Sequence, residues 1–308
     1  MPKSLIVTIP GTTANLGPGF DCIGAALTIH NTLHFSSPAD PQKSVYITVK
    51  GSEADKLVKD DENLVYQGFS KFYHHIDQAP PPVQIEIELG VPLARGLGSS
   101  ATAIVGGLVG ANALAGNPLS LSEITHLAIA MEGHPDNVVP ALLGGCQLSV
   151  PTNSDSWEIC QIPWHETIIP VLAIPDFELS TAEARKILPT NYTRSDVIFN
   201  ASHLGLLLRG LETGCEKQIR VAMQDKIHLP FRKSLIQGFD AVRKAALDAG
   251  AYELTISGAG PSLLALTSHS QAPQVAQAMT ETWKAFDVSV QVKSLQLDTL
   301  GTRAEFLP

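Results

Sequence analysis

The segment Pro92-Leu93-Ala94-Arg95-Gly96-Leu97-Gly98-Ser99-Ser100-Ala101 separates two regular patterns in the sequence. Apolar residues alternate over 83–89, which predicts a half-buried strand, and small apolar residues follow over 99–115, which predicts a helix. Gly116 and Pro118 end that helix, and its Ala and Gly content predicts close packing against a neighbouring backbone. A glycine-rich turn that opens a helix directs free N–H groups and the positive end of the helix dipole toward one point. The segment therefore predicts an anion-binding site.

The two serines of this segment can serve several purposes. Ser99 and Ser100 can each cap the helix, ligate a magnesium ion or bond a phosphate oxygen. A glycine turn closed by a serine N-cap, with no ligand, gives the same pattern, so the segment alone leaves both interpretations open. The segment is not a P-loop, because no lysine follows the second glycine.

Composition excludes several classes of protein. The chain has 308 residues, of which 44% are hydrophobic, enough for two domains or one large one. Its formal net charge of −9 gives no general attraction for nucleic acid or an anionic membrane. The apolar run before Pro10 is too short for a signal peptide or a membrane span, which predicts a cytoplasmic protein. The cysteines are scattered and predict free buried thiols: Cys22, Cys146, Cys160 and Cys215.

Strands and helices are interspersed without strict alternation, which favours an α+β fold. We expect a strand at 4–9 followed by a glycine-rich turn, and a helix capped by residues 61–63 and running to His75. The polar stretch 152–166 reads as irregular, so we place the boundary there, with domains at 1–160 and 161–308. In the second domain we expect helices at 181–188, 196–211, 234–248 and 272–285, and strands at 252–257, 263–266 and 288–292.

A carboxylate ends the helix that follows the anion segment. Ser120 and Glu123 form a capping box at the start of this helix, and Glu132 lies at its end beside Gly133. A negative charge there opposes the helix dipole and costs about 0.3–1 kcal/mol, unless a cation is close. Glu132 is therefore either an exposed residue at a frayed helix end or a ligand of Mg²⁺. Of the polar residues just beyond, Asp136 can act simply as the N-cap of a short segment toward Leu143.

Two further glycine-rich segments lie at 10–21, Pro-Gly-Thr-Thr-Ala-Asn-Leu-Gly-Pro-Gly-Phe-Asp, and at 257–262, Ser-Gly-Ala-Gly-Pro-Ser. Each alone can be a loop or a hairpin turn. Their order with the segment at 92–101 resembles the three motifs of the GHMP kinases. Within this superfamily the run 13–21 is most similar to members that phosphorylate L-homoserine. Thr13 stands where Ser is more usual, and Gly11 where Ala is more usual.

The resemblance implies a two-domain α+β GHMP kinase fold with the active site between the domains. It also implies ATP and Mg²⁺ as cofactors. Asn63 matches an adenine-side contact, and Ser99, Ser100 and Glu132 match metal ligands. The loop from Gly96 to Ala101 would bind the triphosphate. Besides Asn63, the residues expected to bind ATP are Pro92, Leu93, Ala94, Arg95, Gly96, Leu97, Gly98, Ser99, Ser100, Ala101 and Thr102. Residues matching substrate contacts are Asn15, Asp21, Asp136, Asn137, Thr181, Arg185, Arg232 and Gly258.

Two arginines for a carboxylate and one acidic group for an ammonium suit an amino acid. The resemblance thus implies ATP-dependent phosphorylation of L-homoserine, as in threonine biosynthesis, by a cytoplasmic enzyme that binds neither nucleic acid nor membrane. A homodimer is the expectation for an enzyme of this size. Glu132 and Ser99 would serve catalysis through the metal. Asn137 matches the position of a catalytic base in relatives, so either the adjacent Asp136 is the base or the proton passes directly to the phosphate.

Two other functions remain open. The chain could be another GHMP kinase, acting on an isoprenoid alcohol as mevalonate kinase does, although Arg185, Arg232 and Asp21 weigh against this substrate. It could also be a catalytically silent metabolite sensor, against which the retention of Ser99 and Glu132 argues.

Overall fold

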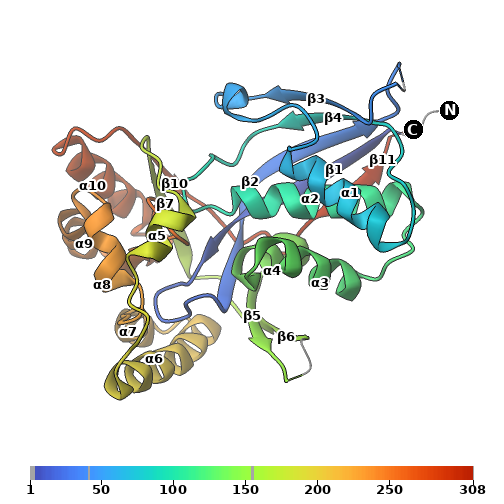
Figure 1. The fold of residues 1–308 in the computed structure, drawn as a ribbon. Helices are drawn as coiled ribbons and strands as arrows, with labels where there is room; N and C mark the ends of the chain where they lie inside the picture. The colour runs from blue at the N-terminus through green and yellow to red at the C-terminus, as the bar shows by residue number, and fades with distance from the viewer. Residues whose placement is uncertain (1–3, 41, 154–155, 308) are drawn as a thin grey trace.

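The computed structural model of the chain describes residues 4–40, 42–153 and 156–307. Two β-sheets lie side by side, and helices pack on each (Figure 1). This arrangement confirms the predicted α+β fold. No helix within the described ranges is both long and apolar enough to cross a membrane.

The first sheet runs in the order β11-β1-β2-β4-β3, with β5 paired to β2 and β6 paired to β5. Its strands are β1 (Leu5–Ala14), β2 (Ile23–Ser36), β3 (Val45–Lys50), β4 (Val83–Glu88), β5 (Cys146–Pro151), β6 (Trp157–Ile162) and β11 (Arg303–Phe306). The helices of this half are η1 (Ala54–Lys56), α1 (Leu64–His75), α2 (Ser99–Leu114), α3 (Leu121–Glu132) and α4 (Pro135–Leu143). Helices α2 and α4 contact the strands directly, and α1 and α3 contact α2.

The second sheet is antiparallel, in the order β10-β7-β9-β8. Its strands are β7 (Ile169–Pro175), β8 (Glu253–Ile256), β9 (Leu263–Thr267) and β10 (Val290–Ser294). The helices of this half are α5 (Thr181–Lys186), α6 (Arg194–Thr213), α7 (Glu216–Ala222), α8 (Leu229–Arg232), η2 (Lys233–Leu235), α9 (Phe239–Asp248) and α10 (Ala272–Lys284).

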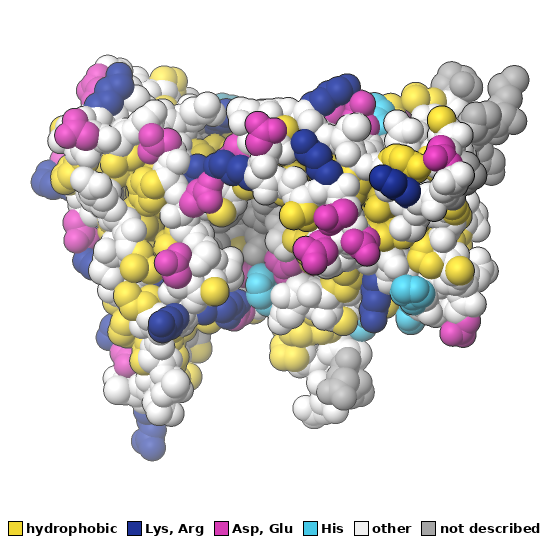
Figure 2. All heavy atoms as spheres, turned by 45° about the horizontal axis from the view of Figure 1, so that its top comes forward, with side chains coloured by type: hydrophobic (Ala, Val, Ile, Leu, Met, Phe, Trp, Pro, Cys, Tyr) yellow, Lys and Arg dark blue, Asp and Glu magenta, His cyan; other side chains and the backbone are white. Residues whose placement is uncertain are grey.

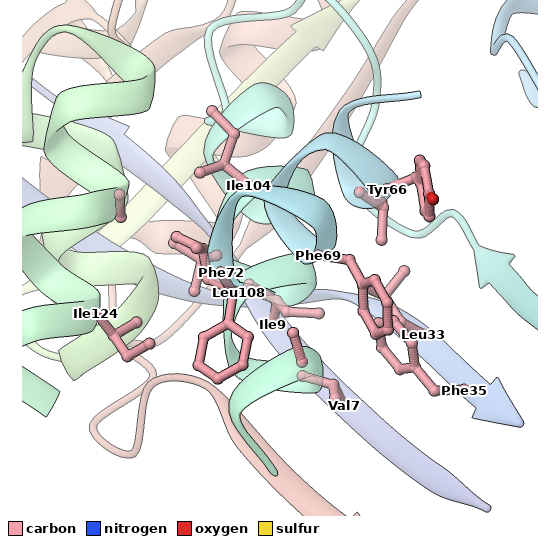
Figure 3. Packing of buried hydrophobic residues seen from close by; sticks show 14 of the residues in the cluster. Val7, Ile9, Leu33, Phe35, Tyr66, Phe69, Phe72, Ile104, Leu108 and Ile124 are labelled. Carbon is pink, nitrogen blue, oxygen red and sulfur yellow. The ribbon is translucent and has the colours of Figure 1, made fainter. Parts of the chain in front are cut away.

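The largest core cluster lies between the first sheet and its helices (Figure 3). Apolar side chains of β1 and β2 pack with the aromatic face of α1 and with α2. The strands contribute Val7, Ile9, Leu33 and Phe35, and α1 contributes Phe69 and Phe72. The glycines of α2 make this contact possible. A Cβ on Gly107 would lie 2.1 Å from the Val65 carbonyl oxygen, and one on Gly110 would lie 2.5 Å from the Phe35 ring. The predicted close packing of α2 is confirmed.

Helix starts were predicted with mixed success. Asn63 caps α1 by accepting from the Val65 N–H, and Ser120 forms the predicted capping box of α3. The N-cap of α4 is His134 and not Asp136, because Pro135 takes the first helical position and leaves Asp136 inside the first turn. The predicted helix 234–248 begins only at Phe239, because Gly238 at φ 75° interrupts the chain after η2.

Strand β1 was predicted too short, and β5, β6 and β11 were not predicted. Strand β1 does not end in a turn at Pro10, because Thr12 to Ala14 pair again with β2 after a register shift. The stretch predicted to be irregular contains β6, which pairs with β5 from Cys146 to Pro151. The end of β1 and strand β6 are held by pairing with another strand, which the local sequence pattern does not reveal.

The chain returns to the first sheet at its end. Strand β6 ends at Ile162 and β7 begins the second sheet at Ile169, while β11 pairs with β1. Leu297 also bridges to Leu27 of β2. The division into domains at residue 160 stays a prediction. The last strand, β11, lies after that boundary in the sequence but belongs to the first sheet.

Candidate active site

The three glycine-rich segments meet in space. The Ser257 hydroxyl donates to the Gly96 carbonyl at 2.7 Å and lies 2.9 Å from the Thr13 hydroxyl, within hydrogen-bond distance. The Thr12 N–H donates to the Leu97 carbonyl at 3.0 Å. Segments that are far apart in the chain thus form one continuous backbone surface.

The loop before α2 is left-handed at several positions, with φ 50° at Ala94, 70° at Gly96 and 66° at Gly98. A Cβ on Gly96 would lie 2.2 Å from the Ser257 carbonyl oxygen, so this contact requires glycine. The N-cap of α2 is Gly98, with no side-chain cap. Ser99 and Ser100 therefore lie in the first turn with half-exposed side chains, and neither is the cap.

A cavity of about 520 Å³ opens at this junction. Figure 2 shows the surface hollowed between the two halves of the molecule, with charged side chains around the hollow. One set of lining residues is apolar and includes Leu57, Val58, Leu64, Val65, Leu89 and Leu93. Another set is charged or polar and includes Asn15, Asp21, His134, Asp136, Asn137, Thr181, Arg185 and Arg232. The cavity therefore combines a surface for an aromatic or aliphatic group with a surface for a charged one.

Nearly all of the predicted site residues line this cavity, including Thr102 and Gly258. The two exceptions are Pro92 and Ala101. Pro92 lines a separate cavity of about 330 Å³, and Ala101 is fully buried in the core.

Two of the predicted metal ligands are in contact. The Ser100 hydroxyl donates to Glu132 Oε2 at 2.7 Å, from the first turn of α2 to the last residue of α3. Glu132 is half-buried, and the last turn of α3 has no basic residue. A hydroxyl and a carboxylate oxygen beside a helix N-terminus are ligand types that suit Mg²⁺.

Asp21 and Arg185 form a bidentate ion pair, with distances of 2.7 and 2.9 Å. This hydrogen bonding raises the pKa of Arg185 further above its ordinary value. Asp21 has φ 58°, and its N–H donates to Asn15 Oδ1 at 3.1 Å. Asn15 in turn donates to the Gly258 carbonyl at 2.8 Å, so the first and third glycine segments support one another.

Arg232 lies beside this pair and is 2% exposed. It donates through Nε to the Ala184 carbonyl at 3.0 Å and through Nη1 to the Gly258 carbonyl at 3.1 Å. Burial, followed by the charge of Arg185, lowers the pKa of Arg232. Two arginines of different helices thus face the same part of the cavity.

Asp136 is 4% exposed and is held by its neighbours. Its Oδ1 accepts from His134 Nδ1 at 2.8 Å and from Asn137 Nδ2 at 3.1 Å. The hydrogen bond from His134 raises the pKa of that histidine. Asn137 Oδ1 accepts from the Thr12 hydroxyl at 2.7 Å, so both polar atoms of Asn137 are engaged. Asp136 Oδ2 has no partner among the described residues and is the freer oxygen of this group.

The guanidinium of Arg95 is engaged by backbone carbonyls. It is 6% exposed and donates to the carbonyls of Leu93, Pro175 and Asp176 at 2.6–2.9 Å. These bonds fasten the loop before α2 to the end of β7. Arg95 therefore holds the two halves together, and its side chain has few donors left for a ligand.

Asn63 is similarly engaged as the N-cap of α1. Its Oδ1 accepts from Val65 N–H at 3.0 Å, and its Nδ2 donates to the Val58 carbonyl at 2.7 Å. Asn63 thus shapes the apolar part of the cavity.

Several residues in or beside the site were not predicted. Thr12 orients Asn137, and His134 orients Asp136; each is a polar residue inside a motif that was already recognised. Lys56 lines the apolar part from η1 and contacts Glu53 at 2.8 Å and Glu178 at 2.5 Å. The sequence around Lys56 has no periodic or motif signal that would have identified it.

Known proteins resemble this chain in sequence and in fold. The family model of the GHMP kinases N terminal domain matches residues 63–145, and that of the GHMP kinases C terminal matches residues 207–285. A homoserine kinase of Trichodesmium erythraeum is 61% identical over 299 residues, which cover 97% of this chain and 97% of that protein. One of Trichormus variabilis is also 61% identical, with 97% and 98% covered.

Among solved structures, the crystal structure of homoserine kinase from Cytophaga hutchinsonii matches with a TM-score of 0.89 at 32% identity, covering 98% of this chain and 97% of that one. The L. major mevalonate kinase in complex with R-mevalonate matches with a TM-score of 0.68 at 14% identity, covering 94% of each chain. The second match is a likeness of fold alone.

Proposed function

The chain belongs to the homoserine kinases of the GHMP kinase family, and from that premise we propose that it transfers the γ-phosphoryl group of ATP to the hydroxyl of L-homoserine. The products are O-phospho-L-homoserine and ADP. The observation that carries the choice of substrate is the group of Asp21, Arg185 and Arg232 on one wall of the cavity. An acid and two arginines complement the ammonium and carboxylate of an amino acid.

The substrate would replace the internal ion pair on the cavity wall. Asp21 and Arg185 bind one another in the structure, with Arg185 half-exposed. An α-amino acid carries both complementary charges, so its ammonium can take Asp21 while its carboxylate takes Arg185 and Arg232. A ligand with only one of these charges leaves one partner of the pair unsatisfied, which is costly in a partly buried site.

The nucleotide would lie with its base against the apolar wall and its triphosphate on the loop before α2. The Gly96 to Gly98 backbone and the N-terminus of α2 supply N–H donors for anionic oxygens. Ser100 and Glu132, with Ser99 beside them, would hold Mg²⁺. The bound metal ion neutralises charge that develops on the phosphoryl oxygens.

Asp136 offers an acceptor for the hydroxyl proton of the substrate. Asp136 Oδ1 already receives two hydrogen bonds, whereas Oδ2 is free to accept a third. Asn137 cannot act as a base, and its amide is held by Thr12. We assign proton acceptance to Asp136 if a base is used, and otherwise the proton passes to the transferred phosphate.

The domain division at residue 160, a cytoplasmic location and a homodimer also belong to this proposal. Light scattering on the purified protein measures the oligomeric state.

An ATP-consumption assay tests the proposed function. Purified protein with Mg²⁺ is supplied in turn with L-homoserine, mevalonate, galactose and L-serine. We expect the highest kcat/KM with L-homoserine. Faster turnover of mevalonate or galactose would reject the substrate assignment.

A further inference from the structure

Phe20 lies on the loop that carries Asp21, and its ring contacts both arginines of the site. The Arg185 guanidinium carbon is 5.7 Å from the centre of the ring, and that of Arg232 is 5.0 Å away. Phe20 is not among the residues that line the cavity, whereas Arg185 and Arg232 are.

A second ring packs against Phe20. His228 stacks on Phe20 at 5.3 Å between ring centres, with 25° between the ring planes. His228 is fully buried, and its Nε2 donates to the Gly17 carbonyl at 2.9 Å. Its Nδ1 has no hydrogen-bond partner among the described residues. Desolvation lowers the pKa of His228, which favours its neutral imidazole.

The loop itself is fixed on the second half of the molecule. A Cβ on Gly17 would lie 2.5 Å from the Met223 carbonyl oxygen, and Asn200 donates to the Pro18 carbonyl at 3.3 Å. The loop that carries Phe20 is therefore held against α6 and the end of α7.

We propose that Phe20, backed by His228, is a positioning residue that holds Arg185 and Arg232 ready for the substrate carboxylate. A guanidinium stacks on a ring through its face, while its N–H donors lie in its plane and stay available to a carboxylate. The ring therefore does not compete with the substrate. Asp21, in contrast, occupies the same donors of Arg185 that the carboxylate needs.

The different contacts that Phe20 and Asp21 make with Arg185 explain why an aromatic ring is needed at position 20. When the substrate displaces Asp21 from Arg185, the arginine loses its strongest internal contact while a second cation lies close to it. The negative face of the ring favours both cations and keeps them together. An aliphatic side chain of similar size fills the space without this attraction.

The inference rests on the proposed function, and the experiment separates the two. Steady-state kinetics are measured for wild type, Phe20→Leu and Phe20→Tyr with L-homoserine and with 3-aminopropan-1-ol, which lacks the carboxylate. Phe286→Leu is the matched control, because Phe286 is a partly exposed phenylalanine outside the cavity. Wild type that does not phosphorylate L-homoserine would reject the proposed function itself.

For Phe20→Leu we expect KM for L-homoserine to rise roughly 5- to 30-fold, as the loss of two cation–π contacts predicts. KM for ATP, and kcat/KM for 3-aminopropan-1-ol, should stay within about twofold of wild type. Phe20→Tyr keeps the ring and should restore most of the affinity. If Leu prevents folding, Phe20→Met is the second aliphatic variant for the same measurements.

Three results would overturn the inference. The first is an equal loss on both substrates, which would indicate a general packing role. The second is an equal rise in KM for ATP and for L-homoserine. The third is a Phe20→Leu variant whose kinetics match those of Phe286→Leu and wild type.

Discussion

Glu132→Gln distinguishes a metal ligand from a residue at a frayed helix end. Glu132 is the last residue of α3, and its Oε2 accepts the Ser100 hydroxyl at 2.7 Å. Glutamine has the same shape and can accept the same hydrogen bond, so the substitution removes the charge and keeps the contact. If Glu132 holds Mg²⁺, we expect kcat to fall at least about 100-fold, because even residues that only support metal ligands typically cost 10- to 100-fold when changed.

Stability should change little, because two effects of similar size oppose one another. Removing a negative charge from the end of α3, whose last turn has no basic residue, stabilises the helix by about 0.3–1 kcal/mol. The hydrogen bond from Ser100 then goes to a neutral acceptor, which weakens it by about 1 kcal/mol. We therefore expect the free energy of unfolding to stay within about 1 kcal/mol of wild type.

The assay combines urea unfolding with steady-state kinetics over a range of Mg²⁺ concentrations. Glu281→Gln is the matched control, because Glu281 is exposed in the last turn of α10 and accepts from Gln277 at 2.7 Å. The control should keep the kcat of wild type. A Glu132→Gln variant with kcat within about threefold of wild type at low Mg²⁺ would refute the metal role. A loss of kcat matched by a large loss of stability would show a structural role instead.

Four further outcomes follow from the site and its surroundings. Asp136→Asn should lower kcat while KM for ATP stays near wild type; unchanged kcat would favour direct transfer of the proton to the phosphate. Arg185→Lys should lower kcat/KM for L-homoserine by about ten- to hundredfold, since lysine cannot form the forked contact, and should affect 3-aminopropan-1-ol much less. Because the pKa of His228 is lowered from 6.5, the unfolded chain takes up this proton first, and the free energy of unfolding should fall as pH drops below about 6.5. In urea titrations His228→Gln should reduce that slope, which is at most about 1.4 kcal/mol per pH unit for one group. Burial and then the charges of Asp136 and Asp21 raise the pKa of Cys22 to about 11, so mass spectrometry after iodoacetamide treatment at pH 7.5 should find exposed Cys160 modified before Cys22.

Local signals in the sequence predicted the helices of the first half well. The capping residues Asn63 and Ser120 act through atoms two or three positions away, so the sequence window contains the whole interaction. The small residues of α2 likewise predicted its close packing. The glycine segments were recognised as chemical features, but their convergence depends on contacts such as Ser257 with Gly96, 161 positions apart.

The features that the sequence did not predict depend on partners outside the local sequence window. Strand β6 is polar on its exposed positions and exists because it pairs with β5. The role of Arg95 in fastening the loop to β7 depends on carbonyls some 80 residues away, so the sequence did not predict it. The pairing of Asp21 with Arg185 was also beyond the sequence, although both residues were assigned to the substrate.

The charges that line the cavity explain why a glycine loop is used there. The cationic side chains are Lys56, Arg95, Arg185 and Arg232, and the carboxylates are Asp21, Glu62, Glu132 and Asp136. The lining is therefore balanced, in a chain whose net charge is −9. Arg95 is committed to backbone carbonyls, and Arg185 and Arg232 lie together at the wall with Asp21.

Few side-chain cations are thus left for a triphosphate, which stays anionic even with Mg²⁺ bound. Backbone N–H groups and the dipole of α2 must supply the remaining attraction, and they can do so only where no Cβ separates them from the ligand. Gly96 and Gly98 leave this stretch of backbone without side chains, and Ser100 with Glu132 adds the proposed metal ligands beside it. Replacing Gly98 with alanine should therefore raise KM for ATP, because its Cβ would lie 2.1 Å from the Thr12 hydroxyl and would displace the N–H groups at the start of α2; an unchanged KM for ATP would contradict this role of the loop.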